Sequence, residues 1–113
     1  MPFIDSRVTL PMTPAVKEEI KCELGRLIAT LHKSETYLMV GIQDQCDLWL
    51  GGEKLEKGAY MAVSLYGSAS REDYSKLTGQ ICRLFAEKLG IPGEAVYVTY
   101  HPVSDWGWNG SNF

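Results

Sequence analysis

The sequence predicts an α/β domain of the α+β sandwich type, in which two βαβ units form one four-stranded mixed sheet. Three observations lead to this prediction. A strand–helix–strand pattern occurs twice along the 113 residues, both helical segments carry one apolar stripe, and the strand segments are short apolar runs between turns. Because short βαβ connections pack their helices against the sheet, we expect both helices on one face.

The first unit begins with a predicted strand at residues 2–10, which is rich in apolar side chains and ends at Pro11. Thr13 is a suitable N-cap, and Pro14 suits the first helical position, where the missing N–H would have no partner. We therefore predict an amphipathic helix of about five turns. Its apolar positions recur at helical spacing: Val16, Ile20, Leu24, Leu27, Ile28 and Leu31.

The next segment completes this unit and leads to the second. Residues 37–42 predict a strand buried on both faces, because the run is almost wholly apolar. Residues 44–47 predict a turn, and residues 48–50 predict a short strand before Gly51-Gly52. The charged residues 53–57 predict a solvated loop.

The second unit repeats the pattern, beginning with a predicted strand at residues 59–66. Ser70 and Asp73 have the spacing of a capping box, in a weaker form because Asp replaces Glu. A second amphipathic helix follows and ends at Gly90, a suitable C-cap. Residues 95–100 predict the last long strand. The apolar stripe of this helix comprises Tyr74, Leu77, Ile81, Leu84, Phe85 and Leu89.

Two regions lie outside this helix-covered arrangement. The aromatic and glycine-rich tail, residues 106–113, has no helical or strand period, and Asn109-Gly110 within it predicts a turn with positive φ. The face of the sheet away from the helices carries Met39 and Tyr60. A large exposed apolar patch usually marks an interface, so we expect a closed oligomer.

Composition excludes several classes of function. With 45% hydrophobic residues, 22% charged residues and a net charge of −3, one domain with no nucleic-acid or membrane partner is expected. We expect synthesis in the cytoplasm, and export would need a route without a signal peptide. Cys22, Cys46 and Cys82 lack metal-ligand spacing, so no metal site is expected. Cys22 and Cys82 fall within the helical patterns and are interpreted as core or boundary residues.

Pro2 offers a specific chemistry. It is small enough for Met1 to be trimmed, which would leave a secondary amine at the start of a buried strand. An α-amino group has a pKa near 7.7–8.0, and burial lowers the pKa of an amine towards the range that suits a general base. The alternative is that Pro2 only protects an ordinary, exposed N-terminus.

The ordered set of motifs resembles the macrophage migration inhibitory factor family of the tautomerase superfamily over essentially the whole chain. No single motif is decisive, but their order and spacing together with the doubled βαβ pattern are specific. The motifs are Met1-Pro2-Phe3-Ile4, Lys33, Tyr37, Gly51-Gly52, Ser64-Leu65, Tyr74-Ser75-Lys76-Leu77, Val96-Tyr97 and Trp106-Gly107-Trp108-Asn109.

The resemblance implies a homotrimer with pockets between subunits and a cofactor-free tautomerisation of phenylpyruvate-like or dopachrome-like substrates. Pro2 would be the catalytic base, and Lys33 would bind the carboxylate of a small aromatic α-keto acid or enol. Without the resemblance, Lys33 would be interpreted as a solvated charge at a helix C-terminus. The remaining implied substrate-binding positions are Tyr37, Ser68, Tyr97 from the next subunit, Thr99, Trp106, Trp108 and Phe113.

The chain departs from the family pattern around this site. His32-Lys33-Ser34 replaces the usual Gly-Lys-Pro, the CxxC of some members is absent at residues 60–63, and Gly67-Ser68-Ala69 lies in a shortened loop. Thr99 replaces an asparagine, and Trp106 replaces a smaller residue and would narrow the pocket mouth. Substrate preference therefore stays open. So does a second function, a cytokine-like protein that engages a cell-surface receptor if exported, with the pocket as a relic.

Overall fold

The computed structural model describes all residues 1–113 and contains the predicted four-stranded mixed sheet, in the order β2-β1-β5-β6. β1 is parallel to β2 and antiparallel to β5, and β5 is parallel to β6. The main elements are β1 (Pro2–Val8), α1 (Pro14–Leu27), β2 (Met39–Gln43), β5 (Ala59–Tyr66), α2 (Arg71–Leu89) and β6 (Val96–Val103). The short strands are β3 (Trp49–Leu50), β4 (Glu53–Lys54), β7 (Gly107–Trp108) and β8 (Ser111–Asn112), and the 3₁₀ turns are Ile28–Leu31, Glu35–Tyr37 and Gly93–Ala95.

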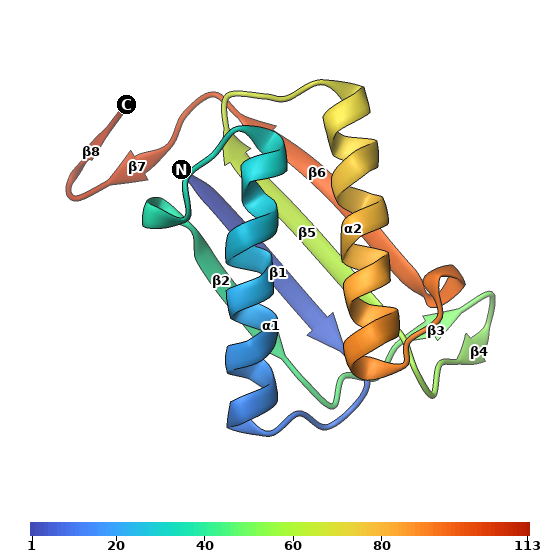
Figure 1. The fold of residues 1–113 in the computed structure, drawn as a ribbon. Helices are drawn as coiled ribbons and strands as arrows, with labels where there is room; N and C mark the ends of the chain where they lie inside the picture. The colour runs from blue at the N-terminus through green and yellow to red at the C-terminus, as the bar shows by residue number, and fades with distance from the viewer.

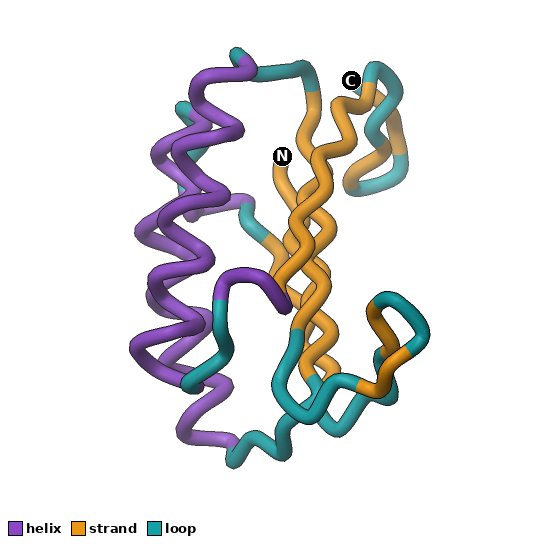
Figure 2. The backbone as a smooth tube through the Cα atoms, turned by 90° about the vertical axis from the view of Figure 1, so that its right-hand side faces the viewer, coloured by secondary structure: helices purple, strands orange, loops and turns teal.

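The molecule has two layers. Both helices lie on one face of the sheet, and the other face is left open (Figure 1), as the view along the sheet in Figure 2 also shows. Inward and outward positions alternate along β1 and β5, so the buried side of each strand meets the helices. The largest fully buried side chains include Ile4, Ile20, Leu24, Met61, Leu77 and Phe85. The predicted fold class is therefore confirmed.

The predicted helix ends are also confirmed. The Thr13 side chain accepts a hydrogen bond from the Val16 N–H at 3.2 Å, and Pro14 is the first residue of α1. Gly90 ends α2 in the left-handed conformation, with φ of 67°. The first helix is shorter than predicted, because its last turn, Ile28–Leu31, tightens to a 3₁₀ turn that still buries Ile28 and Leu31. Neither helix is long and apolar enough to cross a membrane.

Three details of the connecting segments differ from the predictions. The strand predicted as buried on both faces is β2, an edge strand that no helix covers on its outer side, and Met39 on that side is 67% exposed. The predicted solvated loop contains β4, which pairs with β3 across Gly51-Gly52 because both glycines adopt positive φ. The tail forms the β7–β8 hairpin around the predicted Asn109-Gly110 turn.

The open face of the sheet keeps both apolar and polar side chains near solvent. Met39 is exposed as expected, whereas Tyr60 is half-buried because its hydroxyl lies 2.8 Å from Thr99 Oγ1. The prediction that Cys22 is a core or boundary residue is wrong, because it lies on the solvent side of α1, while Cys82 packs partly against the core.

Candidate active site

Pro2 lies at the buried end of the central strand β1. Its partner in the antiparallel pair is Leu65 of β5, and a first-in-strand proline needs no N–H for the ladder. A hollow of about 380 Å³ opens beside Pro2, between the start of β1, the Glu35–Tyr37 turn and the C-terminal hairpin. This hollow is lined mainly by apolar side chains, so a ligand there would be partly shielded from water.

A short hydrogen-bonded chain joins the N-terminus to Lys33. The Lys33 ammonium donates to the Tyr66 carbonyl at 2.9 Å, and the Tyr66 N–H donates to the Met1 carbonyl at 2.9 Å. The pKa of the Met1 amino group is lowered from its ordinary value, first by burial and second by the positive charge of Lys33. An amine at this end of β1 is therefore biased towards its neutral, basic form.

Lys33 is presented by a turn of unusual backbone conformation. His32 has φ of 61° and ψ of 34°, a left-handed conformation at the end of the Ile28–Leu31 turn. The Ser34 side chain then accepts a hydrogen bond from the Thr36 N–H at 3.1 Å, which starts the Glu35–Tyr37 turn. The left-handed conformation of His32 and the hydrogen bond at Ser34 turn the chain, so that Lys33 faces the end of β5 and Tyr37 faces the hollow.

Aromatic side chains from the tail, of which Trp108 and Phe113 are each still about half exposed, lie at the same end of the sheet, where the β7–β8 hairpin lies near the N-terminus (Figure 1). The Trp108 ring meets Tyr37 edge-on, with centroids 5.8 Å apart, and stacks nearly parallel to Phe113 at 6.4 Å. Phe113 also packs on Tyr66 at 5.4 Å. Trp106 lines the hollow, and its carbonyl accepts the Phe113 N–H. The structure thus gathers Pro2 with most of the predicted aromatic residues.

Three predicted site residues lie elsewhere in the chain. Ser68 opens into a separate hollow of about 260 Å³ beside the end of β6. Tyr97 is level with Arg7 across the sheet, five residues along β1 from Pro2, a separation of about 17 Å. Thr99 lies on the open face, with its hydroxyl 2.8 Å from the ring nitrogen Nε2 of His101. A single subunit therefore does not bring these three to Pro2, and the contribution of Tyr97 from a neighbour stays a prediction.

The structure also adds residues that the sequence did not reveal. Thr36, Leu38 and Met39 line the hollow because the Glu35–Tyr37 turn places them beside Phe3. Tyr66 contributes through its backbone N–H and carbonyl. A backbone role leaves no signature in residue type, so only the pairing of β1 with β5 could have indicated Tyr66.

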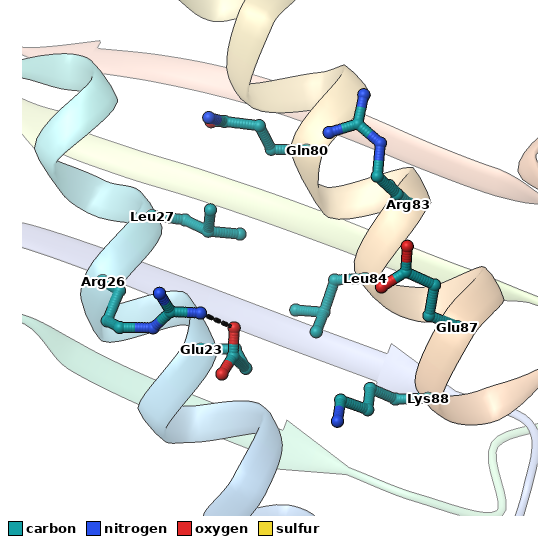
Figure 3. Close-up of a pocket in the computed structure, with 8 residues that line it drawn as sticks. All are labelled: Glu23, Arg26, Leu27, Gln80, Arg83, Leu84, Glu87 and Lys88. Atoms are coloured by element: carbon teal, nitrogen blue, oxygen red, sulfur yellow. Dashed lines mark hydrogen bonds and ion pairs between the residues drawn. The ribbon is translucent and has the colours of Figure 1, made fainter.

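A second, larger hollow of about 410 Å³ lies between the two helices (Figure 3). Its wall is charged: Arg26 pairs with Glu23, and Lys88 pairs with Glu19 at 2.7 Å. Long flexible side chains of both signs line it, with only two hydrophobic residues among eight, and the hydrogen bond from Lys88 to Glu19 raises the pKa of Lys88, which keeps that side chain a cation. No cluster of three or more His, Cys, Asp or Glu side chains suited to a metal ion occurs in the structure. The hollow beside Pro2 is therefore the candidate active site.

Comparison with known proteins identifies the family and the fold of the chain. The family model for macrophage migration inhibitory factor matches residues 1–113. Leishmania major MIF2 is similar at 26% identity, with a TM-score of 0.92 over 100% of this chain and 97% of that chain. The macrophage migration inhibitory factor-like protein of Entamoeba histolytica is 21% identical, with a TM-score of 0.86 over 99% and 98% of the two chains. A fused 4-OT protein described as a symmetric trimer is 20% identical, with a TM-score of 0.85 over 97% and 94%.

Proposed function

The chain belongs to the macrophage migration inhibitory factor family, and from that premise we propose that it is a cofactor-free keto–enol tautomerase whose general base is Pro2. The observation that carries the proposal is the environment of the N-terminal amine. Burial and the Lys33 charge both lower the pKa of an amine at this point of the chain. A base with a pKa near the working pH transfers protons most effectively.

Removal of Met1 prepares two groups at once. It converts the Pro2 nitrogen from a tertiary amide, which has no basic lone pair, to a secondary amine. It also frees the Tyr66 N–H, which donates to the Met1 carbonyl in the structure. The freed N–H lies beside the new base, where it can donate to a substrate oxygen. The backbone of β5 thus supports the charge that develops as the base acts.

The substrate class follows from two groups near the hollow: the Lys33 ammonium, which does not itself line the hollow, and a cluster of aromatic side chains. The Lys33 ammonium has three donors and uses one on the Tyr66 carbonyl, so it can also bind a substrate carboxylate. The aromatic group formed by Tyr37, Trp108 and Phe113 suits an aryl ring. We therefore propose phenylpyruvate-like or dopachrome-like acids as substrates, with Trp106 limiting their width.

The reaction needs only one proton in transit. Pro2 takes a proton from the carbon next to the substrate carbonyl, the electron pair of that C–H bond forms the C=C bond of the enol, and the carbonyl π pair moves to the oxygen. Protonated Pro2 then gives the same proton to that oxygen, which leaves the amine neutral again, and the reverse path uses the same base. In the site, Lys33 and the Tyr66 N–H stabilise the negative charge on the substrate oxygens.

The test compares the trimmed protein with a form that retains Met1, each verified by mass spectrometry. We expect phenylpyruvate tautomerisation to fall on the order of 10²–10⁴-fold in the untrimmed form, because the general base is lost. Circular dichroism and light scattering should be unchanged. Pro2→Gly keeps a free amine and should lose less activity than the untrimmed form. Equal rates for trimmed and untrimmed protein would show that Pro2 is not the base.

A further inference from the structure

His32 has a side-chain partner that explains its backbone conformation. Residues other than glycine rarely adopt positive φ, and they keep it where surrounding contacts hold it. His32 Nε2 lies 3.0 Å from Asp73 Oδ2 in the first turn of α2. The contact therefore joins the turn that presents Lys33 to the rigid start of a helix 41 residues away in sequence.

The Asp73 side chain contacts His32, although its spacing from Ser70 suggests the acidic residue of a capping box. Its backbone N–H donates to the Ser70 hydroxyl at 3.0 Å, which is one half of a capping box. The carboxylate does not complete the box. It reaches across to His32 instead, and the Asp73 side chain is only 27% exposed. The first turn of α2 thus offers a fixed anion to the loop beside it.

His32 and Lys33 are consecutive and have different anchors. His32 bonds to α2, while Lys33 bonds to the Tyr66 carbonyl at the end of β5. We propose that the His32–Asp73 pair is a positioning device that holds the Lys33 ammonium where it would bind the substrate carboxylate. The proposal rests on the proposed function for the role of Lys33, and on geometry alone for the positioning.

The other charged side chains near His32 have partners of their own or form no ion pair, so Asp73 is the charged partner of His32. Arg26 at the end of α1 pairs with Glu23, Glu35 in the following turn covers Gly25, and Lys33 bonds to Tyr66. Lys76, one turn along α2, forms no ion pair.

The first test measures positioning without any substrate. The wild type is compared with Asp73→Asn, which removes the charge, and His32→Gly, which suits the turn but loses the contact. Brief acetylation with a succinimidyl ester, followed by peptide mass spectrometry, gives the reactivity of Lys33 relative to Lys88 in the same sample. Because exposed ion pairs are weak, we expect an increase of about two- to fivefold in both variants. Asp47→Asn, which breaks the exposed Lys54–Asp47 pair at 3.2 Å, is the control. Unchanged Lys33 reactivity in both variants would overturn the proposal.

The second test measures binding of 3-phenylpropanoate, an aromatic acid that cannot tautomerise, against 3-phenylpropanamide. At pH 6 we expect the acid to bind about two- to fivefold more weakly to both variants, with amide binding unchanged. Equal acid affinities at pH 6, or equal losses for acid and amide, would contradict the positioning role. A wild type that binds the acid with these differences but does not tautomerise keto acids would refute the proposed function and still support the positioning device.

Discussion

Lys33 influences the site through a single charge, which makes its contribution measurable. A nearby cation disfavours the protonated amine, so Lys33→Gln should raise the pKa of the N-terminal base towards its ordinary value. The base is active when neutral, so the rising limb of kcat/KM should move to higher pH. The move should be partial, because burial is the larger cause of the lowered pKa of the Met1 amine, one residue from the Pro2 nitrogen. A pH–rate profile between pH 5 and 10 measures it.

Lys33→Gln should also raise KM more for keto acids than for their methyl esters. Loss of a charged hydrogen bond in a partly dry pocket costs on the order of 1–3 kcal/mol, so KM for a keto acid should rise roughly ten- to hundredfold. The methyl ester should be affected far less. Lys76→Gln, an exposed lysine on α2, is the matched control. Equal losses for acid and ester would mean that Lys33 is only a solvated charge.

Ser6 is the one buried side chain whose polar atom has no partner. Its hydroxyl points into the core from β1, where it is fully buried. An unsatisfied buried group costs about 1–3 kcal/mol, so Ser6→Ala should raise the free energy of unfolding by about 1 kcal/mol. Denaturant unfolding measures the change, with the exposed Ser104→Ala as a control that should stay within about 0.5 kcal/mol. A destabilised Ser6→Ala would indicate an unseen partner for the hydroxyl.

Two glycines of the α2 region should respond in opposite directions to alanine. A Cβ at Gly79, in the middle of α2, would meet nothing within 4 Å, so Gly79→Ala should stabilise the protein by about 0.5–1 kcal/mol through helix propensity. Gly90 has φ of 67°, where a side chain costs about 1–2 kcal/mol, so Gly90→Ala should destabilise it. Thermal unfolding of the two variants measures both. A destabilised Gly79→Ala would show that this face of α2 packs against another chain.

The long elements could be predicted from the sequence because each carries a full period and its own end signals. Thr13, Ser70 and Gly90 mark helix ends by local chemistry, and β5 alternates over eight residues. The two hairpins were predicted only in part. The short strand at residues 48–50 and the Asn109-Gly110 turn were expected, whereas β4, β7 and β8 were not, because strands of two residues carry no period and depend on the turn between them. The apolar run of β2 suggested burial on both faces, but periodicity does not reveal that a strand lies at an edge.

Only those residues of the candidate site that act through their side chains could be predicted from the sequence. Pro2, Lys33 and the aromatic residues were identified from residue type and family resemblance. All of them except Tyr97 lie at one end of the sheet. Tyr66 acts through its backbone, and Asp73 changes role because a histidine replaces the usual glycine before Lys33. Tertiary contacts of this kind depend on the pairing of distant segments, which residue patterns do not specify.

The open face of the sheet leads to a prediction about assembly. Met39 and Tyr97 are 67% and 60% exposed, and Tyr97 lies too far from Pro2 to act within one subunit. We predict a homotrimer, in which neighbouring subunits would cover this face and bring Tyr97 to the site. Light scattering at micromolar concentration should give three times 12.6 kDa, and the mass of a monomer would refute the assembly.

A mixing experiment tests whether sites are shared between subunits. A Met1-retaining protein lacks the base, and a Tyr97→Ala protein lacks the neighbouring aromatic residue. When the two are unfolded together and refolded, mixed trimers should contain some sites with both groups intact, so part of the activity should return. Each protein refolded alone is the control. No recovery in mixtures that form trimers would place Tyr97 outside the site.

The central position of β1 imposes an order of events during synthesis. The first strand to leave the ribosome pairs on one side with residues 59–66, so it cannot take its place until most of the chain exists. Once it has done so, Pro2 is buried and the Met1 carbonyl is bonded to Tyr66, while Met1 itself stays partly exposed beside the hollow. We therefore predict that Met1 is removed faster from the nascent chain than from the folded protein. Methionine aminopeptidase added after folding should release Met1 more slowly than from the unfolded chain.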